Sequence, residues 1–352
     1  MIRVLVAEDS DTVRRLLVEI LEADPEILVV GEARNGEEAV RLTKRLRPDV
    51  VSMDIFMPGM DGFDATRQIM SEVPTPIVLV TANLDIDEAV RSMNAMQLGA
   101  LHVMMKPTGP GTSSFARDSQ EFRQMLKTLS QIRVLRHPRT MRRPDAVASP
   151  PPLRKSTWRL RGDRHGIRVV AIATSTGGPA ALRQVLGGLP ARYPHPILVV
   201  QHISPGFIGS LATSLRQVTR LDVKVAEDRE LLRGGTVYLA PDGVQMGVKG
   251  GRVALSSAPE IRGFRPSATF LFESVADCFG RATLAVVLTG MGEDGVTGLY
   301  RIRERGGYVL AQDEDSSVVF GMPGAAVASG LVDEDVTLAR IADRLMEVIG
   351  DV

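Results

Sequence analysis

The sequence predicts an α/β protein with two domains, each a doubly wound, mostly parallel sheet, and a linker between them. Short strands that are apolar on both faces alternate with amphipathic helices twice along the chain, as in parallel sheets covered by helices on both sides. At 352 residues the chain is also too long for one core of ordinary size. A hydrophobic share of 44% lets both domains bury a core, and an aromatic share of 4% makes those cores aliphatic.

The first domain is expected over residues 1–125. Residues 2–7 form a short apolar strand, and a helix follows whose apolar stripe is Val13, Leu16, Leu17, Ile20 and Leu21. Further strands are expected at 27–30, 50–53, 76–80 and 101–105. Helices are expected between them at 35–46, 62–72 and 86–98, and a longer helix at 119–135 closes this domain or leaves it.

The second domain is expected over residues 167–352, where the same alternation begins again. Its strands are predicted at 169–174, 197–202, 223–227, 237–240, 285–289 and 308–311. Its helices are predicted at 178–188, 206–218, 266–279, 294–305 and 338–349. The two halves share a fold class, and no short internal repeat relates them.

Residues 126–166 are expected to hold the end of a helix and then a linker. Residues 133–165 contain ten Lys and Arg residues against two acidic residues, and they include the run Pro150–Pro152. A proline-rich, charged segment without an apolar pattern is typical of an extended spacer. The alternative is a basic arm that contacts an acidic partner or the other domain.

Composition excludes several classes of protein. The formal net charge is zero, which gives no argument for nucleic acid or membrane binding. The single cysteine, Cys278, rules out an internal disulfide and disfavours a zinc site, and its helical context predicts a buried structural thiol. Without an N-terminal signal or an apolar run long enough to span a bilayer, we expect a cytoplasmic protein that is not inserted in the membrane.

Five polar side chains follow the strands of the first domain and should meet at one sheet edge. Glu8 and Asp9 follow the first strand, Asp54 closes the third, Thr81 the fourth and Lys106 the fifth. Such carboxylates repel one another unless a hard divalent cation binds there, so the pattern predicts Mg²⁺ and phosphoryl transfer to Asp54. Lys106 would neutralise charge on the phosphoryl group and Thr81 would donate to one of its oxygens. The alternative is a set of unrelated helix-capping residues.

A serine follows the first strand of the second domain. The strand 169–174 runs into Ser175-Thr176-Gly177-Gly178-Pro179, a turn that exposes the hydroxyl and opens a helix. The geometry suits a nucleophile beside backbone N–H groups. A glycine-rich turn of this kind also binds phosphate, so an anion-binding loop without catalysis is the alternative.

His202 and Asp294 complete a hydrolase pattern. Consecutive parallel strands end side by side, so His202 should reach Ser175 as its general base. Asp294 follows the strand at 285–289 and could orient the imidazole, with Glu293 as the competing acid. The backbone N–H of Met291 could form half of an oxyanion hole.

The first domain resembles response-regulator receiver domains, which have a flavodoxin-like fold. The resemblance rests on the residues Glu8-Asp9-Ser10, Asp54-x-x-Met57-Pro58-Gly59, Thr81-Ala82 and Lys106-Pro107. It implies that Asp54 is phosphorylated by a histidine kinase of a two-component system and that Glu8, Asp9 and Asp54 serve Mg²⁺. Two positions depart from the family: Glu8 is commonly Asp, and Val103 commonly holds an aromatic switch residue.

The second domain resembles the chemotaxis protein-glutamate methylesterase (CheB) domain, a Rossmann-like fold of α/β-hydrolase type. The resemblance rests on motifs that cover nearly all of 167–350: Ala173–Pro179, Gln201-His202-x-x-Pro205-Gly206-Phe207, Leu239-Ala-Pro241, Arg265-Pro266-Ser267, Leu288–Gly295 and Val319–Pro323. It implies Ser175 as nucleophile, His202 as base and then acid, and Asp294 as orienting acid. Thr176 and Met291 are implied oxyanion or site-shaping residues. Gln245, commonly His, and Thr269, commonly Asp, depart from the family and are expected to affect substrate docking.

These resemblances imply an esterase that needs no cofactor and hydrolyses glutamate γ-methyl esters on chemotaxis receptors, with deamidation of glutamine as related chemistry. An unphosphorylated receiver would cover the esterase site. The alternatives are a receiver-linked scaffold with an inactive esterase domain, and a methylesterase of another chemosensory pathway. Nucleic acid binding is disfavoured because the second half lacks a basic recognition helix.

Overall fold

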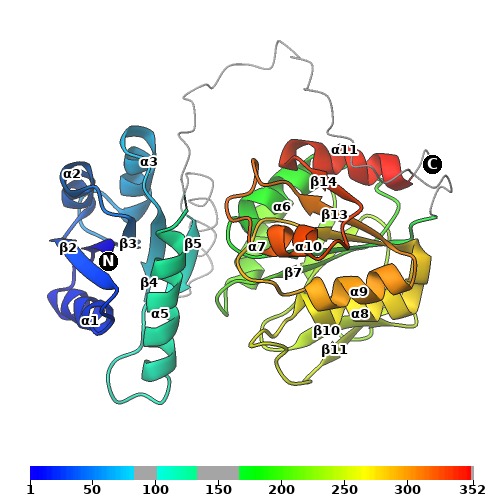
Figure 1. The fold of residues 1–352 in the computed structure, drawn as a ribbon, viewed down its shortest axis with the longest axis horizontal. Coiled ribbons are helices and arrows are strands. Elements are labelled where there is room, and N and C mark those ends of the chain that lie inside the picture. Colours follow the sequence, from blue (N-terminus) through cyan, green and yellow to red (C-terminus); the bar gives the residue numbers. More distant parts are fainter. Residues whose placement is uncertain (83–100, 133–165, 350–352) are drawn as a thin grey trace, which may run out of the picture.

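The structure is a computed structural model that describes residues 1–82, 101–132 and 166–349 (Figure 1). The helix predicted at 86–98 and the linker at 133–165 lie outside the described residues. Within that part of the chain, no helix combines the length and apolar character needed to cross a lipid bilayer.

The first sheet has five parallel strands in the order β2-β1-β3-β4-β5. Its strands are β1 (Ile2–Ala7), β2 (Ile27–Ala33), β3 (Val50–Asp54), β4 (Ile77–Thr81) and β5 (His102–Met105). The helices around it are α1 (Asp11–Glu22), α2 (Gly36–Leu46), α3 (Gly62–Glu72) and α5 (Phe115–Leu129). Because the strand order reverses at β1, the ends of β1 and β3 form a crevice at the carboxyl edge of this sheet.

Alternate side chains of the first sheet fill two cores. One face packs against α1 and α5, through Leu17 and Leu21 on one helix and Phe122 and Leu126 on the other. The opposite face packs against α2 and α3, where Ala39 and Ile69 are among the buried residues. Strands buried on both faces explain the nearly continuous apolar runs in the sequence.

The second sheet has seven parallel strands in the order β14-β13-β12-β6-β7-β9-β8. Its strands are β6 (Val169–Thr174), β7 (Ile197–Gln201), β8 (Asp222–Val225), β9 (Thr236–Leu239), β12 (Thr283–Val287), β13 (Tyr308–Gln312) and β14 (Glu334–Val336). The order reverses at β6, which lies between β7 and β12. The loops after β6, β7 and β12 therefore meet at one edge, where α/β proteins bind their ligands.

Helices and a hairpin cover the two faces of the second sheet. The helices α6 (Gly178–Gly187), α7 (Ile208–Arg216) and α11 (Leu338–Ile349) cover one face. The other face carries α8 (Ala268–Phe279), α9 (Val296–Glu304), α10 (Met322–Ala328) and the antiparallel hairpin β10 (Gln245–Lys249) and β11 (Arg252–Ser256), with the short helix η2 (Gly280–Ala282) leading into β12.

The predicted fold class is confirmed, and the differences are local. The hairpin β10–β11, the edge strand β14 and helix α10 are not among the predicted elements, because they are short or solvent-facing on one side. Helix α5 begins at Phe115 rather than 119 and ends at Leu129 rather than 135.

The prediction of a buried thiol at Cys278 is wrong, because this residue is exposed. The buried stripe of α8 runs through Leu271, Phe272, Val275 and Ala276, and Cys278 lies off that stripe. Periodicity identified the helix but assigned this residue to the wrong side of it.

Buried His102 makes the stability of the first domain depend on pH. Burial lowers the pKa of His102 from 6.5 to about 4. Between these values the unfolded chain binds a proton that the folded domain does not, so stability is complete above pH 6.5 and is lost as the pH falls toward 4. We expect His102→Leu to reduce the stability lost between pH 7 and pH 5 by about 2 kcal/mol. Urea denaturation of the parent and the variant at pH 7 and at pH 5 measures this difference. Equal losses of stability in the two proteins would contradict the prediction.

Candidate active site

Ser175 lies in a turn that the surrounding backbone fixes on both sides. Its N–H donates to the carbonyl of Thr289 at 3.1 Å, and its own carbonyl accepts from Gln201 Nε2 at 2.8 Å and from the Gly178 N–H at 2.9 Å. The turn leads directly into α6, with Pro179 in the first turn of that helix. The structure confirms the predicted serine at a strand-to-helix turn, but Ser175 is buried, at 9% exposure.

Two glycines allow this turn to pack closely. A Cβ atom on Gly178 would lie 2.1 Å from Gln201 Oε1, and one on Gly290 would lie 2.8 Å from Ser175 Cβ. Real Cβ contacts are never so short, so both positions require glycine. The loops after β6 and β12 can approach each other at Ser175 because Gly290 has no side chain between them.

His202 lies beside Ser175 at the end of the neighbouring strand. Thr174 pairs with Gln201 in the register of β6 and β7, and the His202 N–H donates to the Thr174 carbonyl at 2.9 Å. The side-chain nitrogen Nε2 of His202 lies 3.0 Å from Asp294 Oδ2. The other nitrogen, Nδ1, is buried and has no hydrogen-bond partner among the described residues.

The strand order thus brings Ser175 and His202 together, but the predicted hydrogen bond from the serine hydroxyl to the imidazole is not formed in this structure. Nδ1 is the nitrogen left to accept it, since Nε2 faces Asp294. Bonds of this kind often tighten only when substrate is present.

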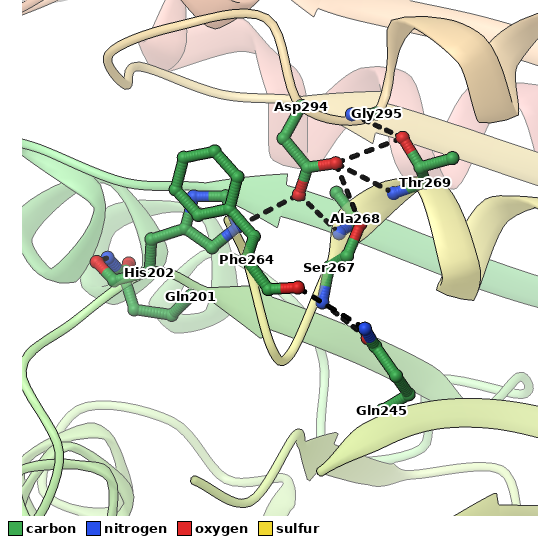
Figure 2. A network of polar contacts seen from close by, with 9 residues as sticks. All are labelled: Gln201, His202, Gln245, Phe264, Ser267, Ala268, Thr269, Asp294 and Gly295. Atoms are coloured by element: carbon green, nitrogen blue, oxygen red, sulfur yellow. Dashed lines mark hydrogen bonds and ion pairs between the residues drawn. The ribbon is translucent and has the colours of Figure 1, made fainter. Parts of the chain in front are cut away.

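Asp294 is held by five donors at the N-terminus of α8 (Figure 2). Oδ2 faces His202 Nε2 and accepts from the Ala268 N–H at 2.6 Å. Oδ1 accepts from the Ser267 hydroxyl at 2.8 Å, and from the hydroxyl and N–H of Thr269 at 2.9 and 3.2 Å. A helix N-terminus presents free N–H groups and a partial positive charge, so it favours an ionised carboxylate.

These contacts decide the charge of the buried Asp294 side chain. Burial by itself raises the pKa of Asp294, but the hydrogen bond and charge of His202 and the bonds from Ser267 and Ala268 outweigh burial, so the pKa lies below its usual value. Asp294 is therefore ionised at neutral pH. An anion at this place favours the Nε2–H tautomer of His202 and leaves Nδ1 as an acceptor.

Glu293, the competing acid, has a different environment. Its side chain is 63% exposed and forms an ion pair with Arg262. The structure therefore brings Asp294, and not Glu293, to His202.

Gln245 and Thr269 support the acid, which corrects the expectation that they affect substrate docking. Both are buried, at 0% and 4% exposure. Gln245 donates to the carbonyls of Pro259 and Phe264 at 3.0 and 3.2 Å and accepts from the Ser267 N–H at 2.8 Å. Thr269 bonds Asp294 and accepts from the Gly295 N–H at 3.0 Å. A residue without accessible surface cannot bind a protein substrate directly.

Thr176 and Met291, the predicted oxyanion residues, lie next to the serine turn. Thr176 directly follows Ser175, and Met291 directly follows Gly290, the residue packed against Ser175. Across the described ranges 1–82, 101–132 and 166–349, no group accepts a hydrogen bond from the backbone N–H of either residue. Both N–H groups are therefore without an acceptor among the described residues.

The acidic pocket of the first domain forms as predicted. Carboxylate oxygens of Glu8, Asp9 and Asp54 all lie within 4.8 Å of one another. Lys106 Nζ lies 2.7 Å from Glu8 and 3.0 Å from Asp54. Thr81 is buried at the neighbouring strand end, where its carbonyl accepts from the Lys106 N–H at 2.8 Å.

Burial raises the pKa of Asp54 and of Glu8, and Lys106 opposes this shift in both. In Glu8 the neighbouring charge of Asp54 raises the pKa further. Three crowded oxygen donors with one lysine leave the negative charge incompletely balanced, and such a donor set suits a hard divalent cation such as Mg²⁺. Glu8 is part of the cluster despite its longer side chain.

The hydrogen bonds around Asp294 can be tested by removing the Thr269 hydroxyl. We expect Thr269→Val to lower the free energy of unfolding of the second domain by about 1–3 kcal/mol, because the Gly295 N–H loses its buried acceptor and Asp294 loses a donor. Thr269→Ser keeps the hydroxyl and is the matched control. Urea denaturation measures both, and a valine variant as stable as the parent would refute this account.

Comparisons with known proteins agree with this architecture. The family model for CheB methylesterase matches residues 170–345, and that for the response regulator receiver domain matches residues 4–112. Protein-glutamate methylesterase/protein-glutamine glutaminase 4 of Myxococcus xanthus is 53% identical over 346 residues, which are 98% of this chain and 96% of that protein. A relative of the same name, number 3, from Anaeromyxobacter dehalogenans is 48% identical over 98% of both chains.

Among solved structures, the CheB methylesterase catalytic domain of Thermotoga maritima is 39% identical to this chain and superimposes with a TM-score of 0.50. The match covers 52% of this chain and 98% of the Thermotoga maritima chain. The resemblance that the sequence motifs indicate is confirmed over both domains. The chain belongs to the CheB methylesterase family, with a response regulator receiver domain before its esterase domain.

Proposed function

We propose that this protein is a phosphorylation-activated serine esterase that hydrolyses glutamate γ-methyl esters on chemotaxis receptors. One observation carries the proposal: the ionised Asp294 holds His202 Nε2 at 3.0 Å and leaves the buried Nδ1 without a partner among the described residues, on the strand end next to the one that leads into Ser175. This is the arrangement in which an imidazole accepts a proton from a serine. The named relatives act on the same class of bond.

In the proposed reaction the Ser175 hydroxyl oxygen attacks the ester carbonyl carbon while His202 Nδ1 takes its proton. The carbonyl oxygen becomes an oxyanion, which the backbone N–H groups of Thr176 and Met291 stabilise. When the tetrahedral intermediate collapses, the C–O bond to the methoxy group breaks and His202 returns the proton, so methanol leaves. Water then attacks the acyl-serine in the same way and releases the glutamate carboxylate and a free Ser175 hydroxyl.

The same site can hydrolyse a glutamine side chain, with ammonia as leaving group in place of methanol. An amine is a poorer leaving group than an alkoxide and must be protonated as it departs. His202 carries the proton needed at that step, because it has just received it from Ser175. We therefore propose receptor glutamine deamidation as a second, slower activity.

We propose that a chemotaxis histidine kinase phosphorylates Asp54. Glu8, Asp9 and Asp54 would hold Mg²⁺, which supplies positive charge at the transferred phosphoryl group when bound. Lys106 lies 3.0 Å from Asp54 and would bind a phosphoryl oxygen, and Thr81 would donate its hydroxyl to another.

Regulation is supported by contacts between the domains. The Ser204 hydroxyl, two residues after His202, donates to the carbonyl of Val103 at 3.3 Å. Val318, which packs on Gly177 beside Ser175, also contacts the receiver core. Figure 1 shows β5, the strand that holds Val103, as the receiver strand facing the esterase domain. Val103 is buried and is not aromatic, so we propose that the signal passes through movement of β5 and Thr81 rather than through rotation of a ring.

The proposed domain boundaries are 1–125 for the receiver, 126–166 for the helix end and linker, and 167–352 for the esterase. The family models match within the first and last of these ranges. We propose that the protein acts in the cytoplasm. The same chemistry could serve a chemosensory pathway other than chemotaxis, and the kinase that phosphorylates Asp54 would identify the pathway.

The nucleophile is tested by release of methanol from a methylated receptor. We expect Ser175→Ala to abolish release, by at least about 10³-fold, because the acyl intermediate cannot form. A scaffold without catalysis would give no release from the parent protein either. Release at the parent rate by the alanine variant would exclude Ser175 as the nucleophile.

The receiver is tested with a small phosphodonor in the presence of Mg²⁺. We expect Asp54→Ala to keep the residual esterase rate and to lose stimulation, because the phosphoryl acceptor is gone. Methanol release with and without the donor measures this. Equal stimulation of parent and variant would defeat the proposal that Asp54 is the switch.

A further inference from the structure

The aromatic ring of Phe264 lies flat on the imidazole of His202. The ring centroids are 4.2 Å apart and the planes are inclined by 10° (Figure 2). Phe264 comes from the loop between β11 and α8, far in sequence from the strand end that carries His202. We infer that Phe264 is a positioning residue for His202: its ring fixes the imidazole plane and stabilises the protonated imidazole. This inference rests on the proposed role of His202 as the base.

The stack covers one face of the imidazole and leaves the two ring nitrogens at its edge open to other contacts. Nε2 lies in that edge and contacts Asp294, and Nδ1 lies in the same edge and is buried without a partner among the described residues. A ring held by one side-chain hydrogen bond can still tilt about that bond. A flat contact with Phe264 opposes the tilt and keeps Nδ1 in the plane in which it must receive the serine proton.

Phe264 is itself fixed by its backbone. Ile261 and Phe264 exchange two hydrogen bonds, of 3.1 and 3.0 Å, across a tight turn in which Gly263 has φ +85°. The Phe264 carbonyl also accepts from Gln245 Nε2 at 3.2 Å. Gln245 in turn accepts from the N–H of Ser267, whose hydroxyl donates to Asp294. The ring on the imidazole face and the acid at its edge are thus held by one connected loop.

The contact has an electronic consequence as well as a steric one. When Ser175 gives up its proton, the imidazole becomes a cation directly against the aromatic face of Phe264. A cation over an aromatic face is attracted to the ring's negative quadrupole, and more strongly where water is excluded. An aliphatic side chain of similar volume fills the space without this attraction.

The experiment compares Phe264→Leu and Phe264→Met with Phe264→Tyr, which restores the aromatic face. Phe279→Leu, at the far end of α8, is the control for loss of a partly buried aromatic residue. The substrate is a small N-acetylated glutamate γ-methyl ester, so that receptor docking does not enter the rate. We expect kcat to fall about threefold to tenfold in the leucine and methionine variants with KM little changed, and to remain near the parent value in the tyrosine variant and the control.

A second measurement observes the stack directly. The carbon-bound imidazole protons of His202 should show upfield NMR shifts from the Phe264 ring current, and these shifts should be lost in Phe264→Leu. Only five histidines are present, and His202→Gln assigns the signal. Leucine and methionine variants that hydrolyse the ester at the parent kcat, or a His202 signal that does not move, would overturn the inference while leaving the proposed function intact. A parent protein with no ester hydrolysis would overturn the proposed function first.

Discussion

The carboxylate of Asp294 at the N-terminus of α8 is the interaction on which the proposed active site depends. Burying a carboxylate is unfavourable unless hydrogen-bond donors surround it. Besides His202, two hydroxyls and two backbone N–H groups donate hydrogen bonds to Asp294. Because these donors act together with His202 to keep the carboxylate ionised, it can orient the imidazole instead of competing for its proton. The loop that leads to these donors also carries Phe264. The same segment therefore holds the acid that contacts the edge of the imidazole and packs against one face of the ring.

The two acidic sites of the chain show how environment decides what an aspartate does. Asp294 and Asp54 are both almost fully buried. Donors hold the pKa of Asp294 below its usual value, whereas burial and crowding with other acids raise that of Asp54. The first environment suits a permanent charge that orients a neighbour. The second leaves a carboxylate poorly satisfied, which suits a residue that binds a cation and accepts a phosphoryl group.

The two sites also use the same topological device. In each sheet the reversal of strand order opens a crevice at the carboxyl edge, beside β1 in the receiver and beside β6 in the esterase domain. Functional groups that follow neighbouring strands meet at that edge. The contact between Val103 and Ser204 connects β5 of the receiver with the loop after His202, so a movement in one sheet has a short path to the other.

Local pattern in the sequence determined the fold class, the order of most elements and the predicted groups at the strand ends: Ser175, His202 and Asp294 in one sheet, and the acidic pocket in the other. That was sufficient because strand ends in parallel sheets converge whatever lies between them. Only the tertiary structure decided that Asp294 rather than Glu293 faces the histidine, that Thr269 and Gln245 hold the acid, that Phe264 covers the imidazole and that Cys278 faces solvent. These outcomes depend on contacts between a hairpin, a loop and a helix end that are distant along the chain, and hydrophobic periodicity carries no record of such contacts.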